Sequence, residues 1–594
     1  MQRILERNAT AREWQRKVQA QADVILDQPP LTPDWVHDPQ ETAAAPLPLV
    51  RPPKSADGRA ASLDIARLFC LRIQTLAITW LATGTVGYRD RAKRELLAVC
   101  DFPDWDGDKF LVTAETAFGA AIGYDWLYHF LADDERERAV RAISEKAIRP
   151  GLAQFAVPVP PYWTRTAMNW NLVCNGALMI AALSVAEADP NAARLFSLCR
   201  ASVSTGFREY SPDGGWVEGP GYWHYATQYA IYLLDSLATA LGTDLGLDAS
   251  AGLAETGLFR LHAAGPSGKL FNFADSEERH SGGYWLFWLA RRYRQRVDAV
   301  IERHAGKAHP MDLLWFEAGG RQPAGLPTAR RFSAAGVVML RGNWDSKQTT
   351  YLGIKGGAND ACEHGHYDLG SFVLDCGGVR WAMDLGPDDY NLPDYFKYPM
   401  RSKYYRTATI GHNTIVIDGH CQPHAANAAI LRDNFTGRIS YVVMDLTTAY
   451  PGTHRAWRGF ALIGGRDVLI VDEIEPEAKG LGSVVWQMHT TAHVGLDGMV
   501  ATLLYPAERD GDAPARFHLR IVEPQSGAWS LRSAAPSGPE GQNPNTGIAR
   551  LVLRQEMVAA PLRLAVLLSP DAGRDVPEEL QHPLADWLPT GGDR

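Results

Sequence analysis

The first half of the chain is patterned as a series of helices. Apolar residues recur there at positions i, i+3, i+4 and i+7, which places them on one face of an α-helix. Gly, Pro and Asp residues separate the periodic segments, and several segments are apolar nearly all round, as inner helices of a layered array are. The predicted helices are 62–84, 110–131, 133–148, 169–188, 191–207, 222–241 and 284–305, preceded by an amphipathic helix within 1–30.

The period changes after residues 319–331. The segments that follow are short, alternating or β-branched runs bounded by Gly, Pro, Asp and Asn, which predict β-strands. They are 332–342, 349–357, 371–386, 413–419, 439–447, 460–474, 484–490, 516–522, 549–556 and 562–569. Helices followed by strands indicate an all-α domain, 1–330, and a large antiparallel β domain, 331–594. No repeat of about 34 or 40 residues is visible, so we expect a closed or partly closed toroid of helical hairpins instead of a solenoid.

Composition narrows the classes of partner. The chain of 594 residues is 46% hydrophobic and 21% charged, as soluble globular proteins are. Its formal net charge of −9 argues against nucleic acid and anionic membranes, because both require a basic field. We see no signal peptide and no run of about 18 apolar residues that would span a membrane. The seven scattered cysteines indicate reduced thiols. We therefore expect a cytoplasmic protein, or a periplasmic one if a native leader is missing; the sequence indicates no oligomeric state.

Two stretches of the helical half carry more polar and aromatic residues than packing requires. In 164–176, "TRTAMNWNLVCNG", Asn169, Asn171 and Asn175 occupy the start of an otherwise apolar helix. Helix capping explains one asparagine but not three. In 213–229, a glycine-rich loop leads into a helix whose first turn carries Tyr222, His224 and Tyr225. Tyr222 and Tyr225 share one helix face, so they form either a buried aromatic contact or a functional phenol.

The third stretch is 361–372, "ACEHGHYDLGSF". In an extended segment alternate residues share a face, which would direct His364, His366 and Asp368 the same way. They are metal ligands, a general base with its helper, or polar residues on a solvated strand. Farther along, Asp384 closes a predicted strand and His412 opens another. Since zinc binds histidine nitrogen and carboxylate oxygen, His366, Asp384 and His412 form a candidate metal site.

Taken together, these stretches resemble the heparinase II/III-like polysaccharide lyases, from about residue 60 to 570. The resemblance rests on "NWNLVCNG", "DGGWVEGPGYWHY", "FNFADSEERH", "NDACEHGHYDLGSFVLDCGGVRWAMDLG" and "YYRTATIGHNTIVIDG". It implies an incomplete (α/α) toroid followed by an antiparallel β-sandwich, with the active site in the cleft between them. It also implies Asn171 as the group that neutralises the substrate carboxylate, Tyr225 and His364 as proton-transfer residues, and zinc on His366, Asp384 and His412. The choices of Asn171 over Asn169 and of Tyr225 over Tyr222 each stay open by one helical turn.

The implied reaction is β-elimination across C4–C5 of a uronic acid in an acidic polysaccharide or oligosaccharide, which gives a 4,5-unsaturated uronate. It requires neutralisation of the carboxylate, a base for the C5 proton and an acid for O4. One tyrosine serves both roles where the C5 hydrogen and O4 are syn, whereas anti substrates require His364 as base. We expect exo action and a structural zinc. The predicted substrate-binding residues are Asn169, Asn175, Tyr222, His224, Glu218, Arg401 and Arg406.

Two other functions compete with the lyase. A glycoside hydrolase on the same fold requires two carboxylates about 5–10 Å apart, and the loops offer Asp213, Glu218, Asp275 and Glu277 without pairing them. A carbohydrate-binding protein without catalysis is the other alternative. The joint presence of Asn171, Tyr225 and His364 argues against it.

Overall fold

The computed structural model describes residues 1–35, 62–279, 283–294, 308–317, 325–506 and 514–587. Its contacts divide the chain into two compact units. The helical unit comprises Met1–Gly214, Tyr222–Leu258 and Ser281–Pro323, and the β unit comprises Gly215–Gly221, Phe259–His280 and Ala324–Arg594. We had expected one boundary near residue 330. Two segments of the first half belong to the β unit because they bond to it; the backbone carbonyl of Leu270, for example, accepts a hydrogen bond from Arg380 Nη1 at 3.0 Å.

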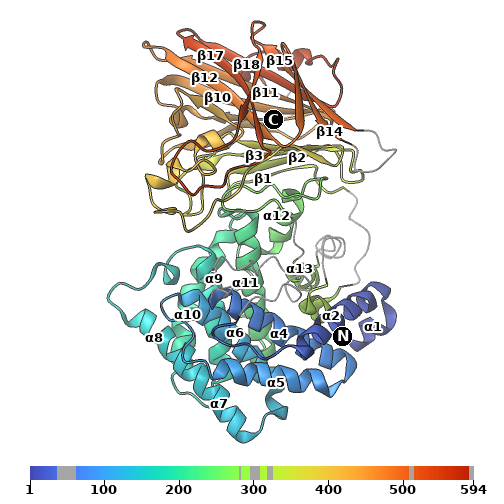
Figure 1. Cartoon of the computed structure of the whole chain (residues 1–594), viewed down its shortest axis with the longest axis vertical. Helices are drawn as coiled ribbons and strands as arrows, with labels where there is room; N and C mark the ends of the chain where they lie inside the picture. The colour runs from blue at the N-terminus through green and yellow to red at the C-terminus, as the bar shows by residue number, and fades with distance from the viewer. Residues whose placement is uncertain (36–61, 280–282, 295–307, 318–324, 507–513, 588–594) are drawn as a thin grey trace. The chain divides into compact units, whose positions relative to one another are not determined.

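The predicted helices are present (Figure 1). The helix expected at 133–148 is α7 followed by a π-helical turn, Ser144–Ile148, and the end of the helix expected at 284–305 lies outside the described residues. Helices α5, α8, α12 and α15 were not predicted. The helices are α1 (Gln2–Arg7), α2 (Ala9–Asp27), α4 (Ser62–Thr83), α5 (Val86–Cys100), α6 (Phe110–Leu127), α7 (Asp133–Ile143), α8 (Arg149–Ala156), α9 (Asn169–Ser184), α10 (Ala192–Phe207), α11 (Gly219–Leu241), α12 (Thr256–Ala263), α13 (Trp285–Tyr293) and α15 (Pro310–Trp315).

The inner helices of the helical unit are the ones with apolar residues on every side. All residues of α6 from Phe110 to Tyr124 are buried, and α6 packs against α4 on one side and α9 on another. Helix α4 is also long and apolar enough to span a membrane, which we had not expected. However, 78% of its apolar 18-residue stretch is buried inside the protein. Burial of this kind is what a core helix of a folded domain requires.

The β unit contains three antiparallel sheets. Their strand orders are β1-β2-β3-β5-β6, β13-β14-β15-β18-β11-β10-β9-β8-β4 and β16-β17-β12-β7. The strands are β1 (Ala329–Phe332), β2 (Val337–Arg341), β3 (Thr350–Lys355), β4 (Gly357–Ala358), β5 (Phe372–Cys376), β6 (Val379–Ala382), β7 (Ile415–Ile417), β8 (Asn427–Asn434), β9 (Ile439–Asp445), β10 (Thr453–Ile463), β11 (Asp467–Pro476), β12 (Leu481–Thr490), β13 (His493–Asp497), β14 (Val500–Tyr505), β15 (Ala515–Glu523), β16 (Trp529–Ser533), β17 (Ala549–Val558) and β18 (Leu562–Ser569).

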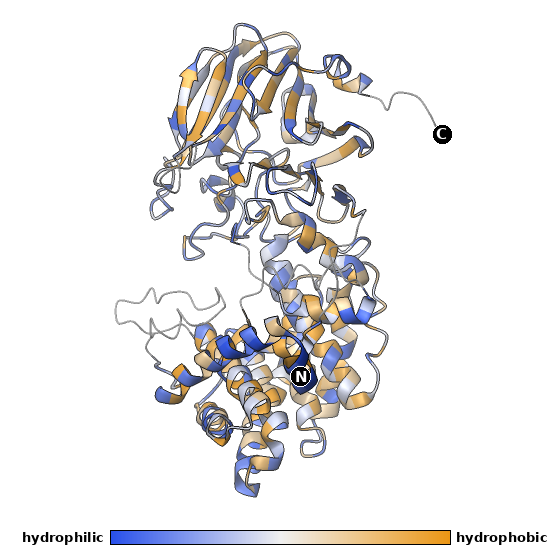
Figure 2. Cartoon of the chain, turned by 90° about the vertical axis from the view of Figure 1, so that its right-hand side faces the viewer, coloured by the Kyte–Doolittle hydropathy of each residue, from blue (hydrophilic) through white to orange (hydrophobic). Residues whose placement is uncertain are grey.

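One apolar core joins the three sheets. Residues of β2, β9, β12 and β17 contribute to the same buried cluster, which is the arrangement of packed sheets (Figure 2). Strand β11 is buried on both faces. Its Val468 and Ile470 point into this core, whereas Leu469 and Val471 point into a second cluster that the C-terminal segment covers with Trp587. Burial on both faces explains why "DVLIVDEI" is apolar almost throughout. The predicted fold class, a helical toroid followed by an antiparallel β-sandwich, is confirmed.

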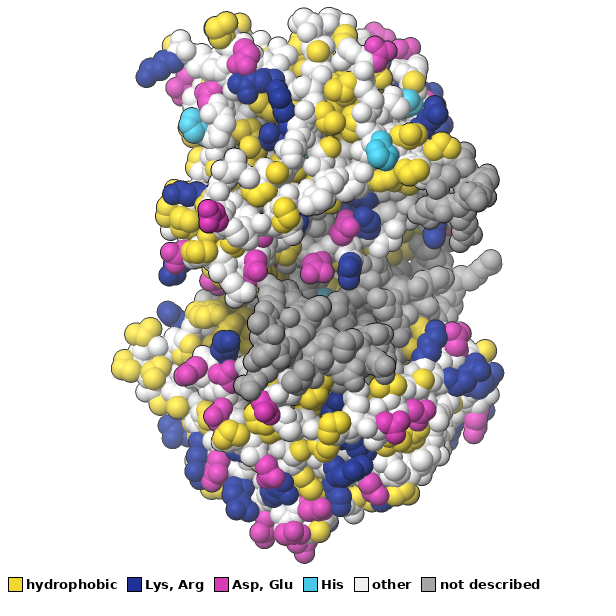
Figure 3. Space-filling model, in the orientation of Figure 1, with side chains coloured by type: hydrophobic (Ala, Val, Ile, Leu, Met, Phe, Trp, Pro, Cys, Tyr) yellow, Lys and Arg dark blue, Asp and Glu magenta, His cyan; other side chains and the backbone are white. Residues whose placement is uncertain are grey.

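The surface agrees with the modest negative charge of the sequence. On the face shown in Figure 3, basic and acidic side chains of the described residues are interspersed over both units. Mixed charge of this kind keeps a protein soluble without creating a basic field for polyanions. An acidic glycan would therefore have to be recognised locally.

Candidate active site and metal site

Three residues of the β unit form a group that can hold a metal ion. His366, Asp384 and His412 are all buried, and each offers a ligand atom within 4.8 Å of the others. Asp384 follows strand β6, and His412 lies between a 3-10 turn, Thr409–Gly411, and strand β7. His366 precedes strand β5 in an irregular segment. The loops at the ends of the strands thus bring together residues that lie far apart in the sequence.

The hydrogen bonds of the two histidines fit a metal. His412 donates Nδ1–H to Asp384 Oδ2 at 2.8 Å, and His366 donates Nε2–H to Asp275 Oδ1 at 2.9 Å. The opposite nitrogens, His366 Nδ1 and His412 Nε2, are buried without a hydrogen-bond partner among the described residues. Histidines that ligate metals have this pattern, in which one nitrogen binds the ion and the other donates to a carboxylate. Two histidines and a carboxylate suit zinc.

Charge reinforces the contact between Asp384 and His412. Burial lowers the pKa of His412, but the carboxylate of Asp384 outweighs burial and raises the pKa above its ordinary value. Burial raises the pKa of Asp384, and His412 in turn outweighs it, so that the pKa falls below its ordinary value. Asp384 is therefore held as a carboxylate, the form that a metal requires.

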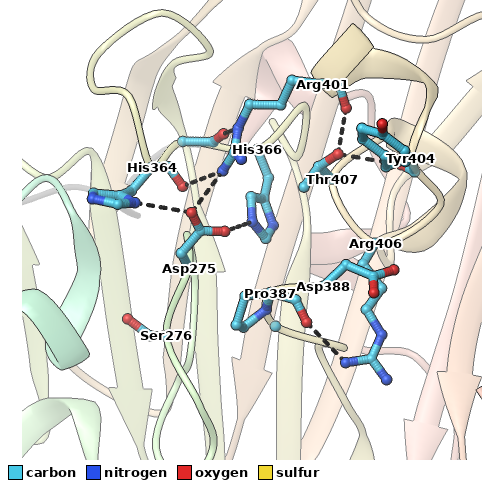
Figure 4. A network of polar contacts seen from close by, with 12 residues as sticks. Asp275, Ser276, His364, His366, Pro387, Asp388, Arg401, Tyr404, Arg406 and Thr407 are labelled. Carbon is cyan, nitrogen blue, oxygen red and sulfur yellow. Dashed lines mark hydrogen bonds and ion pairs between the residues drawn. The ribbon is translucent and has the colours of Figure 1, made fainter. Parts of the chain in front are cut away.

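Asp275 is the centre of the polar network beside this group (Figure 4). Its Oδ2 accepts hydrogen bonds from His364 Nδ1 at 2.9 Å and Arg401 Nη2 at 3.0 Å. Its Oδ1 accepts from His366 Nε2 at 2.9 Å and Tyr395 Oη at 3.1 Å. Burial raises the pKa of Asp275, but Arg401 and the two histidines outweigh it and hold that pKa below its ordinary range. The carboxylate is therefore ionised and saturated with donors.

His364 lies outside the metal group and between two carboxylates. Its Nδ1 bonds to Asp275, and its Nε2 lies 3.8 Å from Oε1 of Glu218. His364 is 6% exposed, and its ring lies edge-on to Phe396, with ring centroids 5.6 Å apart. Because a carboxylate only accepts hydrogen bonds, Nδ1 carries the hydrogen and Nε2 is the nitrogen that can take a proton.

The segment that carries these histidines is not a strand. Residues 361–371 form turns and irregular backbone, with Gly365 N–H donating to Cys362 O at 3.1 Å. The expectation of an extended segment is wrong, because glycines and hydrogen bonds to side chains replace a ladder here. His364 and His366 still converge, since both bond to Asp275. Asp368 is buried, and its Oδ2 has no hydrogen-bond partner within the described part of the chain.

The two arginines predicted to bind substrate form hydrogen bonds within the protein. Arg401 is 5% exposed and donates to Asp275 and to the backbone carbonyls of His364 and Gly365. Arg406 donates to Asn545 Oδ1 at 2.8 Å and to the carbonyls of residues 385 and 387. These contacts hold loops in place, so the structure does not support either arginine as a contact for an acidic substrate.

The helical unit contains a second polar cluster, around Glu115 of α6. The Tyr225 hydroxyl donates to Glu115 Oε1, and the Tyr229 hydroxyl donates to Oε2 at 3.1 Å. Arg67 Nε pairs with Oε1 at 3.1 Å, and the Arg67 guanidinium lies 5.1 Å from the centre of the Tyr225 ring. Burial, followed by the charge of Glu115, raises the pKa of Tyr225 well above its ordinary value. Tyr225 is therefore a protonated phenol at neutral pH.

Asn171 is placed differently from the expectation. It is fully buried and donates its amide hydrogens to the Trp163 carbonyl at 2.8 Å and to Ser202, while its Oδ1 accepts from Gly206 N at 3.0 Å. Asn175, one turn later, donates to the Asn171 carbonyl and to Ser202 Oγ. Both asparagines tie α9 to its neighbours. The NH₂ groups of both asparagines are occupied in this structure, whereas Oδ1 of Asn175 is buried without a hydrogen-bond partner among the described residues. The roles of Asn171 and Asn175 toward substrate stay predictions.

The remaining predicted residues are distributed between the units. Asn169 is buried at the first position of α9. Tyr222 and His224 are partly buried in α11, and the His224 ring lies 4.1 Å from that of Trp285. Glu218 belongs to the β unit, where its Oε2 accepts from Trp216 Nε1 at 3.2 Å.

Comparisons with known proteins agree with this architecture. The family model "Heparinase II/III-like, C-terminal" matches residues 324–551. The C-terminal part of the chain therefore belongs to the heparinase II/III-like family. Among solved structures, heparinase III has a TM-score of 0.65 at 15% identity, covering 94% of this chain and 85% of its own. Heparan sulfate lyase HepC from Pedobacter heparinus has a TM-score of 0.56 at 15% identity, covering 96% of this chain and 88% of its own. No curated protein sequence matches.

Sequence reasoning missed the roles of two buried carboxylates, Glu115 and Asp275. Glu115 is the only charged residue among positions 110–124 of the predicted helix 110–131, and a buried charge requires partners. The sequence therefore contained a signal for this cluster. Asp275 had been counted only as an unpaired loop carboxylate for a hydrolase. Its neighbour Ala274 has a left-handed backbone, with φ +58, a strain that no residue type in "FNFADSEERH" reveals.

Proposed function

We propose that this protein is a lyase that cleaves a uronic-acid-containing glycan by β-elimination. The observation that carries the proposal is His364, a histidine next to a metal-type site whose Nδ1 is fixed by an ionised carboxylate. Fixing one nitrogen in this way prepares the other as a general base. The family of the C-terminal domain supports the same class of reaction.

Tyr225 would donate the proton to O4 as the C4–O4 bond breaks. Burial and Glu115 keep the phenol protonated, which suits an acid and opposes a free phenolate base. His364 Nε2 would remove the C5 proton, and the electron pair of that bond forms the 4,5 double bond. This division favours substrates whose C5 hydrogen and O4 are anti, because the acid and the base are then different residues.

The carboxylate of the uronic acid must also be neutralised in the transition state. Since the amide of Asn171 is occupied by Trp163, Ser202 and Gly206, we assign this role to Asn169, two residues earlier at the start of α9. A zinc ion on His366, Asp384 and His412 would stabilise the loops that present His364. It supplies structure in this proposal and takes part in no chemical step.

The substrate is proposed to be a glycosaminoglycan-like chain or another acidic polysaccharide, attacked from its end. Heparan sulfate is the first polymer to test, because one of the similar structures is a heparan sulfate lyase. The purified protein should be incubated with a panel of uronate polymers and assayed for new ultraviolet absorbance from the unsaturated uronate. New reducing ends without absorbance would show a hydrolase, and binding without either product would show a non-catalytic carbohydrate-binding protein.

A further inference from the structure

Asp275 joins the two parts of the candidate site that the proposed function treats separately. Each of its oxygens accepts a ring N–H of a different histidine: Oδ2 from His364 Nδ1 and Oδ1 from His366 Nε2, both at 2.9 Å (Figure 4). Because a carboxylate cannot donate, it imposes a tautomer on each ring. The lone pair of His364 is then on Nε2, and that of His366 is on Nδ1.

These two tautomers are the ones that the two roles need. His366 Nδ1 is buried without a hydrogen-bond partner among the described residues and belongs to the group that can hold a metal. His364 lies outside that group, and its Nε2, 3.8 Å from Oε1 of Glu218, is the nitrogen that the proposed function uses as the base. The same carboxylate thus prepares one histidine as a ligand and the other as a base.

The surroundings of Asp275 fix it in this position. Ala274 has φ +58, and Ser276 N–H donates to the Ala274 carbonyl at 2.8 Å, so Asp275 is the middle residue of a tight three-residue turn. A left-handed alanine is a backbone strain that surrounding structure must hold in place. Asn272 Nδ2 helps to do so, because it donates to the carbonyls of Ser276 and Asp384, each at 3.3 Å.

Arg401 and Tyr395 donate the remaining hydrogen bonds to Asp275. Arg401 Nη2 bonds both to Asp275 Oδ2 at 3.0 Å and to the His364 carbonyl at 2.9 Å, which fixes the carboxylate relative to the backbone of the histidine it orients. Tyr395 Oη donates to Oδ1 at 3.1 Å. Together with the bonds from His364 and His366, Asp275 accepts four hydrogen bonds. These bonds prevent the carboxylate from rotating away from the two rings.

We propose that Asp275 is a positioning residue shared by the metal site and by His364, so that metal affinity and proton transfer depend on one carboxylate. The catalytic half of this inference rests on the proposed function. The metal half does not, because it is measured without substrate.

The test is Asp275→Asn, which keeps the size of the side chain. An amide offers one oxygen, so only one histidine retains its acceptor, and the NH₂ group opposes the N–H of the other. Zinc affinity, measured by competition with a chromophoric chelator, should fall about 10–100-fold, as it does when a residue behind a metal ligand is removed. At saturating zinc and substrate, kcat should fall by the contribution of a general base, about 10²–10⁴-fold, with KM little changed.

Four variants provide the comparison. His412→Ala should lose zinc while His364 keeps its bond to Asp275, and His364→Ala should keep zinc while elimination slows. If Asp275→Asn does not fold, Tyr395→Phe replaces it, because it removes only one of the four bonds to Asp275, together with the acceptor of Asp388 N–H. It should weaken zinc binding several-fold. Tyr404→Phe is its matched control, since the Tyr404 hydroxyl of the same aromatic cluster donates to the Pro393 carbonyl and not to Asp275.

Several results would overturn the inference. Wild-type protein that binds no zinc, or Asp275→Asn that binds zinc as tightly as wild type, removes the link to the metal. A normal kcat for Asp275→Asn at saturating zinc removes the link to His364. If no uronate polymer is cleaved while zinc affinity still falls in Asp275→Asn, the proposed function fails and the metal half of the inference stands.

Discussion

Tyr225 and Tyr229 offer a matched test of which phenol transfers a proton. Both side chains are buried in α11, and both hydroxyls donate to Glu115, Tyr225 to Oε1 and Tyr229 to Oε2. Replacing either by phenylalanine removes one oxygen atom and one hydrogen bond to the same carboxylate. The two variants therefore make similar structural changes, and only one touches the proposed chemistry.

The expected stabilities follow from the contacts of Glu115. A hydrogen bond to a charged group contributes about 1.5–3 kcal/mol. After Tyr225→Phe, Oε1 still pairs with Arg67 Nε at 3.1 Å. After Tyr229→Phe, Oε2 loses the hydroxyl that donates to it at 3.1 Å. Tyr229→Phe should therefore cost at least as much unfolding free energy as Tyr225→Phe, within that range.

The expected losses of activity have the opposite order, with the larger loss in Tyr225→Phe. Tyr225→Phe removes the proposed acid and should lower kcat by at least about 10²–10⁴-fold, whereas Tyr229→Phe should stay within a few-fold of wild type. Urea unfolding followed by circular dichroism gives the stabilities, and the absorbance of the unsaturated uronate gives the rates. Equal losses of activity in both variants would mean that elimination depends on the cluster as a whole. Wild-type turnover by Tyr225→Phe would reject the assignment and direct attention to Tyr222.

Three further predictions concern the metal group, the asparagines of α9 and Arg401. Zinc at about 100 times its Kd should stabilise the wild type by about 2.7 kcal/mol and should not stabilise His412→Ala, as measured by thermal unfolding with and without zinc; His364→Ala should retain the zinc effect. Asn171→Ala should lower the unfolding free energy by about 1–3 kcal/mol, because it leaves buried groups unpaired. Asn169→Ala should lower turnover more than it lowers stability. If Asn171→Ala lowers turnover more than Asn169→Ala does, the carboxylate-binding role returns to Asn171. Arg401→Ala should cost about 3–5 kcal/mol in urea unfolding, since it leaves a buried carboxylate without its cation, and an unchanged midpoint would refute that cost.

The secondary structure was predictable where long runs of residues are buried. Helix α6 and strand β11 are read from the sequence because apolar residues mark their buried faces continuously. Strands β13 and β16 were missed because most of their residues are exposed or partly exposed, so no apolar pattern marks them. The boundary near 330 described the change of period, but periodicity cannot show that segments such as 259–280 bond to strands much later in the chain.

The candidate site was predictable only in part, for a related reason. His366, Asp384 and His412 were found because their residue types and neighbouring motifs indicate a metal. Asp275 was not, since its histidine partners lie 89 and 91 residues away along the chain, and only tertiary contacts bring them together. An asparagine pattern likewise does not reveal whether an amide faces a ligand or the protein itself.

Both proton-transfer candidates are built in the same way. In the helical unit, the carboxylate of Glu115 accepts from the Tyr225 hydroxyl and pairs with an arginine. In the β unit, the carboxylate of Asp275 accepts from His364 and also pairs with an arginine. A buried ion pair rarely adds stability over apolar residues of the same size, because desolvation offsets the attraction. Two such pairs, each bonded to a group able to move a proton, therefore indicate that the charges are retained for orientation. Replacing each pair by apolar residues of similar volume should then abolish elimination and cost stability only through the other hydrogen bonds of these residues. Retention of activity would show that the carboxylates are not needed for proton transfer.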